Sequence, residues 1–219
     1  MNIIDELEWR GAINQQTDAE GLYKLVDQKS ISLYCGIDPT GDSMHIGHLI
    51  PFMILKRFQL AGHHPVILIG GGTGAIGDPS GRTTERVLQT AEQVKHNADS
   101  LTAQMKKLFG EDRSFTMMNN YDWLSKISLL DFLRDYGKLF NINTMLAKDV
   151  VASRLETGIS FTEFSYQILQ SIDYKMLYEK CGVQLQIGGA DQWGNITNGI
   201  ELIRKTNESH EAFGLTIPL

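Results

Sequence analysis

Short apolar segments typical of β-strands alternate with helical segments along most of the chain, and this alternation limits the fold more than any other feature. The expected strands lie at 31–35, 66–69, 115–118 and 185–187, and the main helices at 46–60, 84–109, 129–136 and 161–178. Such alternation predicts an α/β fold with a parallel sheet of the Rossmann type and helices on both faces. Because ligands bind at the carboxyl ends of the strands in such sheets, we expect a site there.

Two further helical patterns, at about 2–9 and 18–26, precede the first expected strand and are interpreted as N-terminal additions. The 219 residues, 42% of them hydrophobic, can build one fairly large domain, and neither a repeat nor a Pro/Ser-rich linker divides them. We therefore expect one domain over 1–219. The final run, 216–219, is apolar and typical of the middle of a domain, so we expect a truncated chain.

Charge and cysteine content narrow the class of protein. The formal net charge of −6 argues against a surface covered by nucleic acid, because such binding needs Lys and Arg, although a local basic patch is not excluded. Cys35 and Cys181 are too few for a disulfide framework, lie in apolar surroundings that predict burial, and leave pairing open. The N-terminus differs from a secretory signal, and no apolar run is long enough to cross a bilayer. These features predict a soluble, cytoplasmic protein.

The first candidate site is the loop from Asp38 to His48, between an expected strand and an expected helix. His45 and His48 lie at the start of that helix, and Thr40 adds a hydroxyl just before it. Because helix N-termini favour anions, a polyphosphate fits here. An isolated pair of histidines is more often chance or a metal site, but zinc is poorly supported because no third His or Cys ligand stands at ligand spacing.

A second cluster follows the expected strand at 66–69, where a glycine run leads to Asp78. Glycines let the backbone approach a ligand closely, and the Asp78 carboxylate could pair with a substrate ammonium group. A cap or turn carboxylate explains Asp78 equally well, and the run lacks the lysine pattern of a P-loop.

Two more polar clusters come later in the chain. Tyr166, Gln170 and Asp173 are spaced by four and three residues, which places them on one face of a helix, although such a stripe is most often a solvated face. Beyond the strand at 185–187, two glycines lead to Asp191 and Gln192, a pattern that by itself is typical of an ordinary helix cap.

Taken together, the four clusters resemble those of class I aminoacyl-tRNA synthetases, in the same order along the chain. The stretch through Arg86 resembles the tyrosine and tryptophan branch, and the later clusters resemble the bacterial tyrosyl-tRNA synthetases. The residues that carry the resemblance to the class I signature loop are Gly36, Asp38, Pro39, Thr40, His45, Gly47 and His48.

The resemblance implies an ATP site. Thr40 and His45 would hold the phosphates in the transition state and His48 would lie near the adenosine. Asp191 would bind the ribose, while Arg82 and Arg86 would face pyrophosphate from a mobile loop. Position 82 is commonly lysine in these enzymes, and arginine keeps the charge but not the geometry. The remaining residues of the implied ATP site are Gly36, Asp38, Gly47 and Gly189.

The resemblance also implies a tyrosine site. Asp78, Tyr166 and Gln170 would contact the ammonium end, Gln192 the carbonyl, and Tyr34 with Asp173 the phenolic hydroxyl. A pocket built to bind this hydroxyl rejects phenylalanine because its buried polar groups are then left unpaired, and tyrosyl-tRNA synthetases are themselves the established example.

The implied reaction joins tyrosine and ATP into tyrosyl-adenylate and pyrophosphate, and then transfers tyrosine to tRNA(Tyr). Magnesium would accompany ATP, with no tightly bound cofactor and no covalent protein nucleophile. The family's lysine-rich KMSKS-like loop and its anticodon-binding and C-terminal RNA-binding regions would follow Leu219. We therefore expect a fragment that binds tyrosine but activates it slowly.

Several alternatives stay open. A tryptophan enzyme is disfavoured by Tyr34 and Asp173, which suit a phenol. A nucleotidyltransferase shares the paired histidines but does not explain the tyrosine site, and a ligand-binding or RNA-binding module without turnover is the third alternative. Arg204 and Lys205 suit either a helix dipole or the tRNA acceptor stem. Phe161 and the segment 129–139 suit either core packing or the interface of a homodimer, which is the family's usual state.

Overall fold

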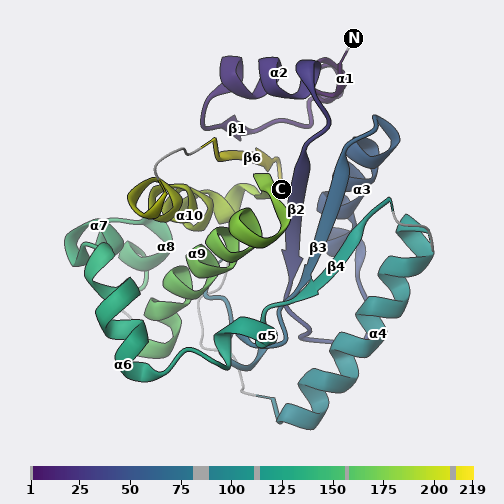
Figure 1. Ribbon diagram of the computed structural model, residues 1–219. Helices are drawn as coiled ribbons and strands as arrows, with labels where there is room; N and C mark the ends of the chain where they lie inside the picture. Colours follow the sequence, from purple (N-terminus) through teal and green to yellow (C-terminus); the bar gives the residue numbers. More distant parts are fainter. Residues whose placement is uncertain (1, 81–88, 111–113, 156–157, 208–210) are drawn as a thin grey trace.

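A six-stranded sheet forms the centre of the molecule (Figure 1). The computed structural model describes residues 2–80, 89–110, 114–155, 158–207 and 211–219. The strand order is β1-β6-β5-β2-β3-β4, and all neighbours from β6 to β4 are parallel. The strands are β1 (Gln15–Gln16), β2 (Ser32–Ile37), β3 (His64–Ile69), β4 (Thr116–Asn119), β5 (Val183–Gly189) and β6 (Phe213–Ile217). The predicted α/β fold with a central parallel sheet is therefore confirmed.

Two strands on one side of the sheet, β6 and the edge strand β1, were not predicted. The apolar run near the end of the chain forms β6, which pairs with β5 and is buried from Gly214 to Ile217. The two-residue strand β1 pairs antiparallel with β6, so the sheet is not wholly parallel. Both glutamines of β1 are polar, which hides the strand from a search for apolar segments.

The helices largely follow the predicted positions, with two differences. The helix expected from residue 84 begins at Ala91, because Thr90 caps it by accepting a hydrogen bond from the Gln93 amide at 3.2 Å; residues 81–88 lie outside the described part of the chain. The helix expected at 129–136 is divided into a short α-helix, a π-helix and a 3-10 turn. The helical elements are α1 (Ile3–Trp9), α2 (Ala19–Gln28), α3 (Ile46–Leu60), η1 (Thr73–Ala75), α4 (Ala91–Phe109), α5 (Tyr121–Leu124), α6 (Leu129–Asp131), η2 (Phe132–Tyr136), η3 (Gly137–Leu139), α7 (Ile142–Leu146), α8 (Asp149–Ala152), α9 (Phe161–Cys181), η4 (Ala190–Gln192) and α10 (Trp193–Thr206).

Alternate residues of the strands pack into two separate hydrophobic cores. Leu33 and Ile67 point to a core that contains residues of α1, α2, α3 and α4. Tyr34 and Val66, one position away, point to a second core with α9 and α10. Figure 1 shows α9 and α10 on one side of β2 and β3, and α3 and α4 on the other. Helices thus cover both faces, as predicted.

A register shift in β5 decides which of its side chains face the site. Ser32 pairs with Val183 but Leu33 pairs with Leu185, so one extra residue is inserted between them. As a result Gln186 lies opposite Tyr34 and shares its face of the sheet. Without this bulge a glutamine would not face the same cavity as the tyrosine.

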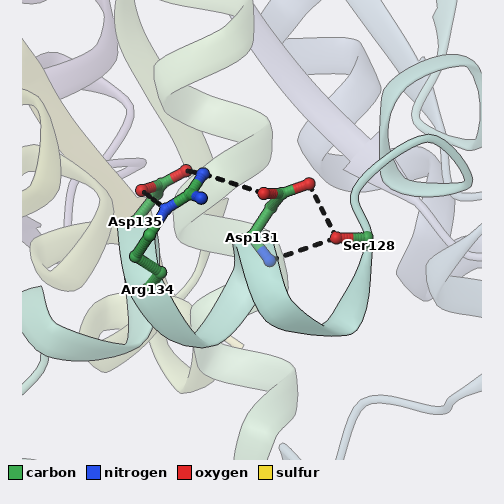
Figure 2. A network of polar contacts seen from close by, with 4 residues as sticks. All are labelled: Ser128, Asp131, Arg134 and Asp135. Carbon is green, nitrogen blue, oxygen red and sulfur yellow. Dashed lines mark hydrogen bonds and ion pairs between the residues drawn. The ribbon is translucent and has the colours of Figure 1, made fainter.

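The segment from α6 to η2 has a charged side held by local contacts (Figure 2). The Arg134 guanidinium donates to both carboxylate oxygens of Asp135 and to Asp131, each at 2.8 Å. The hydroxyl of Ser128 donates to Asp131 at 2.6 Å and accepts from its backbone amide. These side chains are exposed, and the hydrogen bond from Arg134 together with its charge lowers the pKa of Asp135.

The two cysteines differ in their surroundings. Cys35 is buried as predicted, and burial raises the pKa of its thiol to about 12. Cys181 is only partly buried, at the end of α9, where the predicted burial was wrong because the helix end reaches the surface. Both are free thiols, which answers the question of pairing. Within the described ranges, no helix combines the length and apolar character that a membrane span requires.

Candidate active site

A cavity of about 360 Å³ opens at the carboxyl ends of β2, β3 and β5. This volume lies in the range of ordinary small-molecule sites, and the position is the one expected for a parallel sheet. All the predicted site residues that the structure describes line this cavity: Tyr34, Gly36, Asp38, Thr40, His45, Gly47, His48, Asp78, Tyr166, Gln170, Asp173, Gly189, Asp191 and Gln192. Arg82 and Arg86 lie outside the described residues.

The two histidines stand together at the start of α3. Their rings stack with centroids 3.7 Å apart and an interplanar angle of 24°. His45 occupies the N-cap position of α3, but its side chain makes no capping hydrogen bond. Its ring is therefore not used to bind the backbone amides of the first helical turn. A Cβ on Gly47 would lie 3.1 Å from the His45 ring, which explains the glycine between the two histidines. The positive end of the helix dipole and two imidazoles thus meet at the cavity mouth.

The opposite end of the cavity holds a phenol and a carboxylate. Tyr34 is 1% exposed, and its hydroxyl has no hydrogen-bond partner among the described residues. Burial, with the nearby Asp173 carboxylate as the second cause, raises the Tyr34 pKa well above its ordinary value. Because a buried hydroxyl without a partner is costly, Tyr34 is a candidate ligand contact.

Asp173 is buried and held by two neutral donors. The side-chain amide of Asn120 donates to one carboxylate oxygen at 2.9 Å, and the Trp123 indole donates to the other at 2.7 Å. Burial raises the pKa of Asp173 to about 7, although these two hydrogen bonds act in the opposite direction. The carboxylate is therefore fixed in orientation but not paired with a positive charge among the described residues.

The middle of the cavity carries the other acidic groups. Tyr166 donates to Asp38 at 2.8 Å, and Gln192 donates to Asp78 at 2.9 Å and to Asp191 at 3.1 Å. Burial raises the pKa of Asp78, opposed by hydrogen bonds from Ser80 and Gln192. Carboxylates gathered here, which accept hydrogen bonds from neutral donors, make this part of the cavity suited to a cation such as an ammonium group.

The alternative interpretations of these clusters can now be judged. The stripe on α9 is not a solvated face, because Tyr166 is 6% exposed and Asp173 is 2% exposed. Asp191 does not cap a helix, since neither η4 nor α10 has a side-chain cap. Asp78 does accept the Ser80 amide at 2.9 Å, so it makes a turn and also lines the cavity.

Asp38 connects the loop after β2 to the rest of the cavity. Its carboxylate accepts from Thr73 at 2.6 Å and from Tyr166 at 2.8 Å, so it belongs to the network around the acidic middle of the cavity. Thr73 accepts in turn from Asn120, which also donates to Asp173. One chain of hydrogen bonds therefore joins the loop after β2 to the phenol end.

Four polar residues around the cavity escaped the sequence analysis. Asn120 and Trp123 orient Asp173, Thr73 bonds Asp38, and Gln186 keeps a buried side-chain oxygen without a partner among the described residues. Asn120 directly follows β4, so the rule that sites form at strand ends could have found it. Nothing in the local sequence marks Trp123, which reaches the site through folding alone.

Residues 26–219 match the family described as tRNA synthetases class I (W and Y). The chain belongs to this class I synthetase family. Among curated relatives, the tyrosine–tRNA ligase 1 of Enterococcus faecalis is 77% identical over 221 residues, covering 100% of this chain and 53% of the relative. The tyrosine–tRNA ligase of Latilactobacillus sakei is 76% identical and covers 100% of the chain and 52% of the relative. This synthetase chain thus spans about half the length of the curated relatives it matches.

Solved structures agree with this assignment. A C-terminally truncated mitochondrial tyrosyl-tRNA synthetase of Aspergillus nidulans superposes with a TM-score of 0.89 at 34% identity, covering 100% of this chain and 69% of that one. The tyrosyl-tRNA synthetase of Archaeoglobus fulgidus, solved with L-tyrosine, gives a TM-score of 0.78 at 20% identity, covering 99% and 64%, and shows the shared fold. The class I synthetase fold expected from the sequence is confirmed.

Proposed function

We propose that the cavity binds L-tyrosine and ATP and joins them into tyrosyl-adenylate, as the first step of tyrosine–tRNA ligation. The observation that carries this proposal is the buried Tyr34 hydroxyl, which has no hydrogen-bond partner in the described part of the chain, beside the oriented Asp173 carboxylate. A phenolic hydroxyl can accept from Tyr34 and donate to Asp173, so one group satisfies both. Indole has a donor but no acceptor, which disfavours tryptophan.

The tyrosine ammonium group then lies at the acidic middle of the cavity. Asp78 supplies negative charge, and the oxygens of Tyr166 and Gln170 can accept hydrogen bonds from the remaining N–H groups of the ammonium. Asp38, bonded to Tyr166, adds a second carboxylate nearby. Gln192 donates to Asp78 and Asp191, and rotation of its amide would bring it to the substrate carbonyl.

The reaction needs no covalent bond to the protein. An oxygen of the tyrosine carboxylate attacks the α-phosphorus, that O–P bond forms, the bond to the bridging oxygen breaks, and pyrophosphate leaves. A magnesium ion that arrives with ATP would supply further positive charge to the phosphates. Thr40, His45 and the positive end of α3 stabilise the charge that moves onto pyrophosphate. His48, Gly47, Gly36, Gly189 and Asp191 hold the nucleoside, and Arg82 and Arg86 complete the pyrophosphate contacts.

For the whole protein we propose transfer of tyrosine to tRNA(Tyr) in the cytoplasm, with residues 1–219 within one catalytic domain. The curated relatives are named tyrosine–tRNA ligases, which supports this. Arg204 and Lys205 pair with Glu201 in the last turn of α10 and complement its dipole. Arg204 is exposed and is free to exchange its carboxylate partner for a tRNA phosphate.

We also propose a homodimer. Phe161 is 74% exposed, and Leu129 and Leu130 are exposed to 71% and 76%, so core packing does not explain these three side chains. Leu133 and Ile142 are further exposed apolar residues of the same part of the chain. Figure 1 shows α6, α7 and α8 gathered on one side of the molecule. Exposed apolar side chains in such numbers are typical of an interface.

The test of the function measures binding and chemistry separately. Calorimetry should give micromolar-range binding of tyrosine with much weaker binding of phenylalanine and tryptophan. Asp173→Ala should weaken tyrosine binding at least tenfold and leave ATP binding unchanged. His45→Ala should slow formation of tyrosyl-adenylate and leave the dissociation constant of tyrosine unchanged, because its ring lies at the other end of the cavity. Equal binding of tyrosine and tryptophan would refute the proposed substrate.

A further inference from the structure

The loop that joins β2 to α3 has little support of its own. Gly41, Asp42 and Ser43 are exposed and belong to neither a helix nor a strand. This loop nevertheless carries Thr40 and leads directly into His45, both of which line the cavity. Groups that must face a ligand accurately are usually held by neighbouring structure, so the support of this loop has to come from elsewhere.

Side-chain amides of α4 and of Gln89, two residues before it, bind the backbone of the loop along its length. Asn97 donates to the Pro39 carbonyl at 3.0 Å, and Gln89 donates to the Thr40 carbonyl at 3.0 Å. Gln104 accepts from the Met44 amide at 3.1 Å and donates to the Asp42 carbonyl at 2.8 Å. The side-chain amide of Gln104 thus donates one hydrogen bond to the loop backbone and accepts one from it, which is the pattern that a neighbouring β-strand makes.

The placement of these amides is not explained by the packing of α4 itself. Asn97 is 2% exposed on a helix whose other buried residues are apolar, and an amide in such a place is costly unless its bonds are made. Its oxygen accepts from Gln93, and its nitrogen reaches the loop. Gln104 follows Asn97 by seven residues, which is two helical turns and keeps both on one face. The positions of Asn97 and Gln104 are therefore explained by their bonds to the loop and not by packing in the core.

We propose that Asn97 and Gln104 are positioning residues that hold the backbone from Pro39 to Met44, and with it Thr40 and His45, at the mouth of the cavity. Neither residue lines the cavity, so they act through the loop. The catalytic consequence rests on the proposed adenylation. Because misplacement of catalytic groups by about 1 Å can cost on the order of 100-fold in rate, loss of these bonds should slow adenylate formation about 10- to 100-fold.

The experiment compares Gln104→Met and Asn97→Leu, which keep size but remove the amide, with Gln59→Met as the matched control. Gln59 on α3 also donates to a backbone carbonyl, that of Phe109 at 3.1 Å, but it does not touch the loop. Each variant is measured for single-turnover adenylate formation at saturating ATP, for tyrosine binding, and for hydrogen exchange of the backbone amides from 40 to 45. Gln104 is only partly buried, so its variant should fold even if Asn97→Leu does not.

We expect Gln104→Met to slow adenylate formation, to leave the tyrosine dissociation constant unchanged, and to speed exchange of the Met44 amide, whereas Gln59→Met changes none of the three. The proposal is overturned if exchange of the loop is unchanged, or if both glutamine variants lose rate and tyrosine binding together. If the unmodified chain forms no adenylate, the proposed function fails, and exchange at Met44 still decides whether Gln104 holds the loop.

Discussion

Tyr34 and Gln186 lie opposite each other on β2 and β5, and each keeps a buried polar atom without a partner among the described residues. Such atoms usually lower stability, so they are expected where a ligand supplies the missing bond. By contrast, the buried Asp173 carboxylate accepts two hydrogen bonds. At the scale of single residues, the site is recognised by buried polar atoms that lack hydrogen bonds to the described residues.

Replacing Tyr34 with Phe should therefore separate stability from binding. The variant removes an unpartnered hydroxyl, so its free energy of unfolding should be unchanged or rise by up to about 1 kcal/mol. Tyrosine should bind about tenfold more weakly and phenylalanine with unchanged affinity, since about 1.4 kcal/mol of hydrogen bonding is lost. Urea unfolding and calorimetry measure the two effects.

Tyr174→Phe serves as the control for that change. The Tyr174 hydroxyl donates to the Phe213 carbonyl at 2.7 Å and lies 3.0 Å from the Gln184 carbonyl, so its loss should destabilise the fold by about 1–3 kcal/mol. A Tyr34→Phe variant that loses as much stability as Tyr174→Phe would contradict the assignment of Tyr34 to a ligand.

Asp173 predicts a specific pH dependence. Its pKa is raised to about 7 in the folded state, against roughly 3.9 when unfolded. Between these values the folded chain holds a proton that the unfolded chain has released, so stability from this group falls as pH rises from about 4 to about 7 and is level above. Relative to Asp173→Asn, the free energy of unfolding of the unmodified chain should decline across that window. Parallel profiles would contradict the raised pKa.

At the scale of elements, α9 is set in place by polar groups at its start. Ser160 caps it by accepting from the Glu163 amide at 3.2 Å. Glu163 pairs with Arg154, which follows α8, and Arg154 also donates to the Gly158 carbonyl at 3.2 Å. This buried contact fixes the beginning of the helix that presents Tyr166 to the cavity, so the position of part of the site depends on an ion pair outside it.

The buried pair should matter far more than exposed ones. The side chains of Arg154 and Glu163 are 8% and 4% exposed, so Arg154→Met, which leaves a buried carboxylate unpaired, should cost about 3–5 kcal/mol. Lys95→Met breaks an exposed pair with Asp99 on α4 and should cost less than about 1 kcal/mol. Urea unfolding compares the two, and similar losses would contradict a structural role for the buried pair.

At the scale of the whole molecule, the described surface carries apolar side chains that neither core uses. They include Phe161, Leu129 and Leu130, and the last two directly precede Asp131, which pairs with Arg134. A surface with an apolar part and a charged border has the composition of a protein interface. The proposed dimer would involve α9, because Phe161 is the first residue of that helix.

Phe161→Asp should shift the chain from dimer to monomer by placing a charge in the interface. Leu60→Asp, at the end of α3 and 76% exposed, is the matched control and should leave the assembly unchanged. Light scattering after size-exclusion chromatography measures the mass over a concentration series. A monomeric unmodified chain, or equal behaviour of both variants, would contradict the proposed interface.

The sequence by itself determined the elements and most of the cavity wall. Apolar periodicity located four of the six strands, β2, β3, β4 and β5, since buried parallel strands are short and largely apolar, and motifs at strand ends named residues that line one cavity. It did not find β1, whose two glutamines have no apolar signal, or the broken helix from 129 to 139.

Only the tertiary structure decided how those side chains meet. The bulge in β5 places Gln186 on the same face of the sheet as Tyr34. Folding brings Asn120 and Trp123 into contact with Asp173, from which they are separated by 53 and 50 residues. Amides of α4 reach the loop before α3 across about 60 residues of sequence. Local sequence encodes backbone preference and burial, whereas the partner of a polar group is set by packing between distant elements. For this reason the loop from Asp38 to His48 could be predicted from the sequence, whereas the α4 side chains that bind its backbone could not.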